Sequence, residues 1–293
     1  MENRADSFQK FRPKLYGIAY RMLGSKADAE DMLQDAYMRW HQTDVERVQV
    51  PEAWLTTTVT RLCIDRLRSA RAEREAYIGP WLPEPLTGAE IAPPDRQAEL
   101  ASDLSVAFMI VLERLAPEER AAFLLHEAFD CDYAEIAKIL GRNEASCRQI
   151  VHRARERVRR DRPRFQVSES ARQKLLEKFI AAFQAADREQ LLAMFAPDAT
   201  WTADGGGKAK AITKTVQGAA RVAKLVAGFG RHLAREYQGR LTFRLMPING
   251  ETGVLACLDG NPAMAMSFET DGVRILAAYN VVNPEKLRRI ALT

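Results

Sequence analysis

The feature that most constrains the fold is a helix-turn-helix pattern between Asp132 and Arg160. A short apolar helix ends at Leu140, and the next residue, Gly141, can take the left-handed conformation that ends a helix. Asn143 can then cap a second helix. Two helices joined by so tight a turn predict a module that places its second helix in the major groove of DNA.

This second helix has two distinct faces. At about 100° per residue, its apolar side chains fall on one side, which must face the core. The other side carries Arg148, Gln149 and His152 in the half of the helix that reaches base edges. Arginine and glutamine are the side chains that read guanine and adenine, so the helix is predicted to recognise DNA.

The charge of this region supports the same interpretation. From Arg142 to Arg164 there are nine arginines against three carboxylates, a net charge of about +6, whereas the whole chain carries only +4. Such a density suits the neutralisation of DNA phosphates. The alternative is a solvated basic face, but the turn, the cap and the separate apolar face favour DNA binding.

The composition of the chain limits which other kinds of protein it can be. A chain of 293 residues fits two or three domains, and 47% apolar residues suffice for their cores. No apolar run approaches the roughly 20 residues of a membrane span, and the start lacks a signal-peptide core, so we expect a soluble, cytoplasmic protein without membrane contact. Four cysteines and four histidines lack ligand spacing. We therefore expect no metal and no cofactor, with each cysteine in a core.

Three amphipathic helices are predicted near the start, over 7–23, 26–41 and 51–74. The second carries an acidic stripe, formed by Asp28, Asp31 and Asp35 with Arg39, on a face separate from its apolar one. A solvated surface explains the stripe, because such like-charge spacings cost only a few tenths of a kcal/mol. A docking surface for a basic partner is the functional alternative. The stripe alone favours the solvated surface.

The third helix carries a stripe of Thr57, Arg61, Arg68 and Arg71, which suits a nucleic-acid backbone. Trp54 either stacks on an unpaired base or, as is more common for a lone tryptophan near a helix start, packs in the core. This combination of threonine, arginine and a nearby tryptophan indicates binding of single-stranded nucleic acid without establishing it.

A proline-rich linker follows over 76–97, because five prolines rule out a continuous helix there. Trp81 and Leu82 are apolar in this otherwise polar segment, so we expect it to dock onto another part of the protein. Helices over 100–115 and 117–129 then lead into the helix-turn-helix.

The pattern changes after Ser168. Two helices, over 170–186 and 187–195, precede a strand over 199–203 and a helix over 218–233. Alternating runs typical of antiparallel strands follow over 240–247, 253–258, 263–269 and 273–282. This order predicts an α+β domain in which a curved sheet wraps around helices and encloses a pocket.

The acidic-faced helix, the Thr/Arg-striped helix and the basic helix-turn-helix, in this order, closely resemble an extracytoplasmic-function (ECF) sigma factor of the sigma-70 family over residues 7–162. The rest resembles a SnoaL-like cone, as in the SigJ-type subgroup. The resemblance implies a multidomain chain of two all-α sigma modules and an α+β cone. Its domains would be region 2 (7–75), a linker (76–97), region 4 (98–162) and a regulatory domain (166–293).

The resemblance also implies roles for individual residues. The partners would be promoter DNA and the β′ and β subunits of RNA polymerase core. The core-binding residues would be Asp28, Asp31, Gln34, Asp35 and Arg39. The minus-10 element would be bound by Trp54, Thr57, Arg61, Arg68 and Arg71. The minus-35 element would be bound by Ser146, Arg148, Gln149, His152, Arg153 and Arg155.

Three motifs look like marks of the subgroup and imply a regulatory contact in place of a separate anti-sigma protein. Their residues are Trp81, Leu82, Pro83, Asp204, Gly205, Gly206, Gly207, Lys208, Asn283, Pro284 and Lys286. The glycines lack the spacing of a phosphate loop. They instead let a backbone approach closely, near the linker, and Lys208 can pair with a carboxylate. Asp204 is expected in a loop that faces outward.

The cone offers no convergent acid and base, since Met264, Phe268 and similar residues occupy its later strands. We therefore expect no enzyme; a protein-contact role is favoured over a small-molecule ligand, and catalysis comes last. The chain is predicted to be a promoter-specificity subunit modulated by its fused domain. A one-component regulator with a ligand-sensing cone is the alternative, but it leaves the first 75 residues unexplained, and an enzyme with a DNA-targeting appendage is a third hypothesis.

Overall fold

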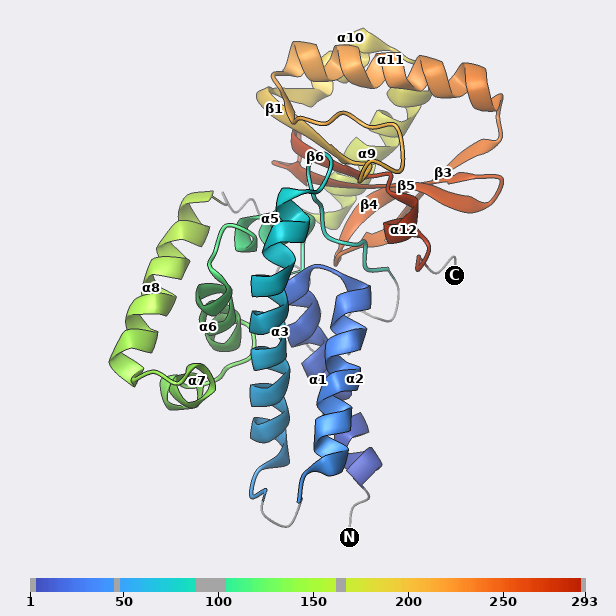
Figure 1. The fold of residues 1–293 in the computed structure, drawn as a ribbon. Helices are drawn as coiled ribbons and strands as arrows, with labels where there is room; N and C mark the ends of the chain where they lie inside the picture. Colours follow the sequence, from blue (N-terminus) through green and yellow to red (C-terminus); the bar gives the residue numbers. More distant parts are fainter. Residues whose placement is uncertain (1–3, 45–47, 88–103, 162–166, 291–293) are drawn as a thin grey trace. The chain divides into compact units, whose positions relative to one another are not determined.

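The computed structural model describes residues 4–44, 48–87, 104–161 and 167–290 (Figure 1). These residues form two compact units. The first contains the helices up to residue 76 and those from 108 to 161. The second contains the linker residues 77–87, the short segment 105–107 and the domain from residue 164 onward.

Three helices form the first half of unit one: α1 (Arg4–Leu23), α2 (Lys26–Gln42) and α3 (Pro51–Glu75). They pack along one another (Figure 1), with Leu15, Trp40 and Leu55 fully buried between them. Ser25 caps α2 by accepting a hydrogen bond from the amide of Asp28, as its position before a helical pattern predicts. The three predicted helices are thus confirmed.

Four more helices follow: α5 (Val106–Leu112), α6 (Pro117–Glu127), α7 (Tyr133–Leu140) and α8 (Glu144–Asp161). From Phe108 onward they belong to unit one. The predicted helix over 100–115 is shorter, since it begins at Val106; residues 100–103 lie outside the described part. The helix-turn-helix is confirmed. Gly141 ends α7 in the left-handed conformation, and Asn143 accepts from the amide of Ser146 at 2.8 Å.

A buried arginine joins the two halves of unit one. Arg120 is 2% exposed and donates to the carbonyls of Met22 at 2.6 Å and Leu112 at 2.8 Å. Its Nη1 also binds Glu113 at 2.7 Å, and Glu113 pairs with Arg74. We call Arg74, Glu113 and Arg120 the Arg120 centre. Burial lowers the pKa of the Arg120 guanidinium to about 9, and Glu113 compensates part of that cost.

The second unit is built on a sheet of six strands in the order β2-β1-β6-β5-β4-β3. β1 and β6 are parallel and the other neighbours are antiparallel. The strands are β1 (Phe195–Asp204), β2 (Val216–Gln217), β3 (Leu241–Ile248), β4 (Glu251–Leu258), β5 (Asn261–Thr270) and β6 (Ile275–Val281). The helices are α9 (Glu169–Gln184), α10 (Arg188–Met194), α11 (Ala219–Tyr237) and α12 (Pro284–Leu287).

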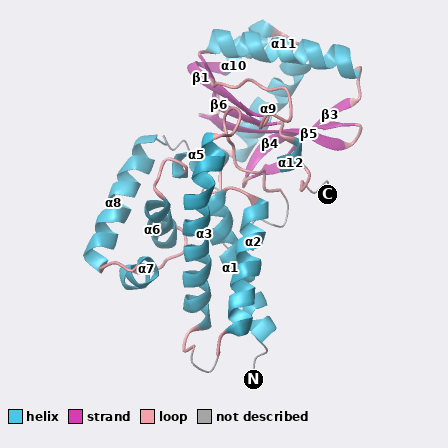
Figure 2. Ribbon diagram, in the orientation of Figure 1, coloured by secondary structure: helices cyan, strands magenta, loops and turns pink. Residues whose placement is uncertain are grey.

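The core of this unit lies between the sheet and helices α9 and α11 (Figure 2). Phe179 of α9 stands at its centre, with ring contacts to Trp201 of β1 and Phe268 of β5. The α+β class is therefore confirmed. The short elements β2 and α12 were not predicted, and β1 is longer than the predicted strand over 199–203, because it begins four residues earlier, at Phe195, and ends one residue later, at Asp204.

Candidate nucleic-acid interface and linker-binding site

The polar face of α8 is exposed as its periodicity predicts. Arg148, Gln149, His152 and Arg153 are exposed, whereas Ser146 and Arg155 are half-buried. The apolar face, with Cys147 and Val151 fully buried, holds the helix against its module.

Two of these arginines are already bound to acidic side chains. Arg148 pairs with Glu144 at 2.8 Å and lies 5.3 Å from the ring centre of Tyr133. Arg155 pairs with Glu127. Both pairs lie at the surface, where an ion pair contributes at most about 1 kcal/mol, so phosphate groups can displace the carboxylates.

The arginines of α3 contact the helix-turn-helix module. Arg61 donates to the carbonyls of Lys138 and Ile139, each at 2.9 Å, at the end of α7. Arg68 binds Glu118 at 2.7 Å, and the same carboxylate binds Arg142 at 2.6 Å. Two residues of the predicted minus-10 surface are thus bound to the helix-turn-helix module, and Arg68 shares Glu118 with Arg142 of the turn before α8.

The other residues of the α3 stripe differ in environment. Thr57 donates its hydroxyl to the carbonyl of Ala53 at 2.7 Å. Trp54 is half-buried, with its ring centre 5.4 Å from that of the buried Trp40. The side chain of Arg71 lies outside the described residues.

The acidic stripe of α2 is mostly an open surface. Asp31, Gln34, Asp35 and Arg39 are exposed, while Asp28 is half-buried and binds Arg66 at 3.0 Å.

Sequence reasoning missed Met38, a side chain that is 52% exposed beside Arg39. An exposed, adaptable apolar residue within a charged face is typical of a protein-binding surface.

The linker docks on the second unit around one buried carboxylate. Asp204 has no exposed surface. Its Oδ1 accepts from the Tyr77 hydroxyl at 2.6 Å, and its Oδ2 accepts from the Leu82 amide and from Lys286 Nζ, both at 2.8 Å. We call Tyr77, Asp204 and Lys286 the Asp204 centre. The expectation that Asp204 faces outward was wrong, because the linker covers the end of β1.

Lys286 and Asn283 complete this centre from the far end of the chain. Lys286 Nζ also donates to the Leu82 carbonyl at 2.5 Å and lies 4.2 Å from the ring centre of Trp81. Asn283 donates to the Tyr77 hydroxyl at 2.9 Å. Burial, with the hydrogen bond to Asp204, raises the pKa of Tyr77, so the phenol keeps the proton that it donates.

The glycine loop lets the linker approach. Gly206 has φ +56, and a Cβ there would lie 2.4 Å from Asn283 Nδ2 and 2.6 Å from the Tyr77 hydroxyl. A Cβ on Gly207, φ +71, would lie 2.7 Å from Ile78 Cδ1. Both positions therefore need glycine, because the backbone has a positive φ and because a Cβ would clash with the linker or with Asn283. The predicted close approach of a backbone to the glycine loop is thus confirmed. The prediction that Lys208 pairs with a carboxylate is also confirmed, and its partner is Glu285.

A second anchor fixes the end of the docked linker. Leu86 and Asn249 exchange two hydrogen bonds, from the Leu86 amide to Asn249 Oδ1 at 3.1 Å and from the Asn249 amide to the Leu86 carbonyl at 2.8 Å. Leu82, Pro83 and Leu86 are buried. The predicted docking of the linker is confirmed, and its receptor is the C-terminal domain.

No group of three or more His, Cys, Asp or Glu side chains in the part of the chain that the structure describes is arranged to hold a metal ion. All four cysteines are buried, as predicted. Among the helices described, none has the length and apolar character that crossing a membrane requires.

Comparisons with protein families match both helical modules. The family described as Sigma-70 region 2 matches residues 8–73. The family described as Sigma-70, region 4 matches residues 106–158.

Individual relatives match nearly the whole chain. The ECF RNA polymerase sigma factor SigJ of Mycobacterium tuberculosis is 37% identical, over 95% of this chain and 91% of its own length. The probable ECF RNA polymerase sigma factor SigI of the same species is 30% identical, over 96% and 93%. The crystal structure of M. tuberculosis SigJ superposes with a TM-score of 0.77 at 34% identity, covering 99% of this chain and 100% of that one.

Proposed function

The chain belongs to the ECF sigma factors of the sigma-70 family, and on that premise we propose how its surfaces serve a promoter-specificity subunit of RNA polymerase. We assign core binding to Asp28, Asp31, Gln34, Asp35 and Arg39, on the β′ subunit, with the β subunit as a further partner. The exposed face of α2 supports this assignment because it presents carboxylates around the apolar Met38. The domain boundaries follow as region 2 over 7–75, a linker over 76–97, region 4 over 98–162 and a regulatory domain over 166–293.

The promoter surfaces lie on α3 and α8. Trp54, Thr57, Arg61 and Arg68 contact the minus-10 element, together with Arg71. Arg148, Gln149 and His152 reach base edges of the minus-35 element, and Ser146, Arg153 and Arg155 contact phosphates. Because Arg61 is bound to the end of α7, promoter binding requires α3 to separate from the helix-turn-helix module.

The C-terminal domain restrains this separation by holding the linker. The observation that carries this proposal is the Asp204 centre, which fixes residues 77–82 of the connection between the two helical modules. While these residues are docked, less of the connection is available to span a promoter. Release of the linker therefore frees the subunit for initiation.

Run-off transcription with purified bacterial core polymerase tests this proposal. The full chain is compared with Asp204→Asn, which weakens the linker anchor, and with Asp259→Asn, which removes a charge from an exposed pair with Arg240. We expect Asp204→Asn to raise promoter-specific transcription by about fivefold or more, at the lower end of allosteric coupling, and Asp259→Asn to have no effect. Transcription at or below the wild-type level from Asp204→Asn would contradict the restraint.

The second hypothesis, a one-component regulator, predicts sequence-specific DNA binding without core polymerase. It leaves the region 2 match over residues 8–73 without a role. An electrophoretic mobility assay with and without core polymerase separates the two hypotheses, since a sigma subunit requires the core for promoter-specific complexes.

A further inference from the structure

The C-terminal domain contains a second strongly basic stretch, separate from the helix-turn-helix. Residues 205–244 carry nine Lys and Arg side chains against a single carboxylate, a net charge of about +8, whereas the whole chain carries +4. This charge is larger than the +6 of the segment 142–164 from which DNA binding is predicted. The centre of the stretch is α11, which packs against the sheet (Figure 2).

Four basic residues of this stretch form a stripe along α11. At about 100° per residue they fall within about 80° of one another, on the side opposite the buried face of the helix. Over the length of the stripe the helix rises about 21 Å. We call this surface the α11 stripe; its residues are all exposed, and they are Arg221, Lys224, Arg231 and Arg235.

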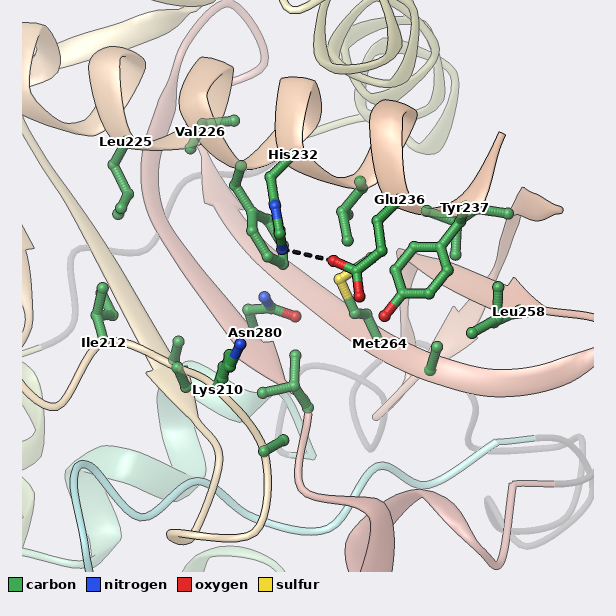
Figure 3. A pocket seen from close by; sticks show the side chains of 18 of the residues that line it. Lys210, Ile212, Leu225, Val226, His232, Glu236, Tyr237, Leu258, Met264 and Asn280 are labelled. Atoms are coloured by element: carbon green, nitrogen blue, oxygen red, sulfur yellow. Dashed lines mark ion pairs between the residues drawn. The ribbon is translucent and has the colours of Figure 1, made fainter. Parts of the chain in front are cut away.

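The other sides of α11 already have neighbours. The buried face packs on the sheet, and Leu225 and Val226 line the pocket that the sequence predicts, a cavity of about 600 Å³ (Figure 3). Glu236, the one carboxylate of the helix, also lines this cavity and pairs with His232 at 2.7 Å (Figure 3). The α11 stripe thus faces away from its own domain.

The α11 stripe differs from the polar outer face of an ordinary surface helix because all its charges have one sign. Like charges three or four residues apart destabilise a helix. The neighbouring helix α9 mixes the two signs on its exposed side, where Lys174, Glu177 and Lys178 lie together. An anionic partner would relieve the repulsion within the α11 stripe.

The charges of the α11 stripe are available to such a partner. Within the described part of the chain, none of its four side chains forms an ion pair. Two other cations of the basic stretch are already neutralised, Lys208 by Glu285 and Arg240 by Asp259. The stripe is therefore the part of the basic stretch on α11 that lacks a counter-charge.

A glycine lies within the α11 stripe. Gly228 falls between Lys224 and Arg231, and a Cβ there would meet no atom within 4 Å. Packing within the domain therefore does not require glycine, although glycine is unfavourable inside a helix. The missing side chain lets the backbone of a partner come close to α11.

The partner that matches this surface is the phosphate backbone of duplex DNA. Three of the four residues are arginines, whose guanidinium group binds phosphate through two parallel hydrogen bonds. A row of Lys and Arg along one helix is typical of nucleic-acid-binding proteins, and 21 Å is the axial length of about six base pairs. The stripe contains no aromatic side chain on which unpaired bases could stack, which favours duplex over single-stranded DNA.

The length of the chain keeps this domain within reach of promoter DNA. Only residues 162–168 separate the end of α8, assigned above to the minus-35 element, from the start of α9. Eight residue steps span at most about 28 Å. Binding of α8 to DNA therefore raises the effective concentration of neighbouring duplex at the C-terminal domain.

We propose that the α11 stripe binds the phosphate backbone of duplex DNA beside the site bound by α8. The contact is independent of sequence, because phosphates carry no base information. The proposal goes beyond the promoter contacts assigned above to α3 and α8, and rests on them only for the position of the duplex along the promoter.

Salt-dependent binding of the full chain to DNA, without core polymerase, tests the stripe itself. The affinity for a duplex of about 40 base pairs and arbitrary sequence is measured by fluorescence anisotropy from about 50 to about 200 mM KCl. Each phosphate contact contributes about 0.9 to the slope of log K against log salt, so loss of the stripe should make the slope shallower by about 3–4. Glutamine keeps the helix propensity of the residues it replaces, and the stripe variant combines Arg221→Gln, Lys224→Gln, Arg231→Gln and Arg235→Gln.

A matched variant removes the same charge elsewhere in the domain. It replaces four exposed cations outside α11 by glutamine: Lys174, Lys178, Arg188 and Arg274. Its slope should change by less than about 1. Equal slopes for the two variants would reduce the effect to net charge and overturn the proposal. A stripe variant that binds DNA like the wild type would also overturn it, and would indicate an acidic protein surface as the partner.

Directed cleavage locates the duplex while the α11 stripe stays intact. All four native cysteines are buried, so one exposed cysteine can carry an iron chelate that cleaves nearby DNA. Ala220→Cys places the chelate beside the stripe, and Gln173→Cys places it on α9 as the control. In promoter complexes with core polymerase, we expect only the first to cleave the duplex next to the minus-35 element.

Absence of cleavage from Ala220→Cys would overturn the position proposed for the duplex. The two measurements also separate this proposal from the promoter contacts of α3 and α8. Because the salt measurement uses neither a promoter nor core polymerase, failure of those contacts would leave its outcome unchanged.

Discussion

Each compact unit of the molecule contains a buried ionic centre. The central residue is a cation in one unit and an anion in the other. The Arg120 centre is organised around a buried cation, which donates to two backbone carbonyls and to Glu113. The Asp204 centre is organised around a buried anion, which accepts from a phenol, a backbone amide and an ammonium group.

The difference lies in what each centre holds. The carbonyls bound by Arg120, those of Met22 and Leu112, stand at the ends of α1 and α5, where helices leave acceptors unpaired. The Arg120 centre is thus part of the helical fold itself. Two of the three donors to Asp204 belong instead to the linker, a segment that can leave without dismantling the sheet. Disrupting the first centre should therefore unfold a module, whereas disrupting the second should release a segment.

The largest expected effect is that of Arg120→Met. The substitution removes the buried cation, leaves two carbonyls without their donor and leaves Glu113 paired with Arg74 alone, which should lower the free energy of unfolding of unit one by about 3–5 kcal/mol. Urea unfolding of the full chain, followed by circular dichroism of the helices, measures the loss. Arg159→Met, at an exposed residue whose contact with Glu156 is long, at 3.8 Å, should change stability by less than about 0.5 kcal/mol. A similarly small effect of Arg120→Met would show that the Arg120 centre does not stabilise the fold of unit one.

Asp204→Asn should have a smaller and more local effect. Lys286 loses its carboxylate, but on undocking of the linker its ammonium group regains water, so the penalty is limited to the free energy of docking, about 2 kcal/mol. Amide hydrogen exchange at Leu82 and Leu86 should accelerate about thirtyfold, while exchange in the core of the sheet stays unchanged. Uniform acceleration throughout the sheet would mean that Asp204 supports the domain as the Arg120 centre supports its helices.

The two centres also differ in how far the sequence predicts them. The linker motif, the glycine loop and the Asn-Pro-Glu-Lys motif were identified, yet Asp204 was placed in an outward loop. Its burial depends on a contact between residues 77 and 204, and no local pattern encodes that separation. Asn283 followed by Pro284 is a helix-start signal that could have revealed α12.

Arg120 was missed altogether, because it follows Glu118 and Glu119 and only then does the apolar part of α6 begin. An arginine in such a position fits equally a long side chain that reaches solvent, and only the packed carbonyl of Met22 distinguishes the two cases. By contrast, the helix-turn-helix was predictable because its cap, turn and apolar face are all local.

The smallest expected effect is that of Tyr77→Phe, which measures how much one of the three donors to Asp204 contributes to docking of the linker. Tyr77→Phe removes one of the three donors to Asp204 and the acceptor of Asn283, but Leu82 and Lys286 keep the carboxylate paired. Because Tyr77 is half-buried, water can replace its hydroxyl, and we expect the linker to lose about 1 kcal/mol of docking free energy, seen as roughly fivefold faster exchange at the Leu82 amide. Tyr37→Phe on α2 removes a hydroxyl in the other unit and should leave that rate unchanged. If Tyr77→Phe released the linker as fully as Asp204→Asn, the phenol and not the ion pair would be the main anchor, and the parallel between the two ionic centres would fail.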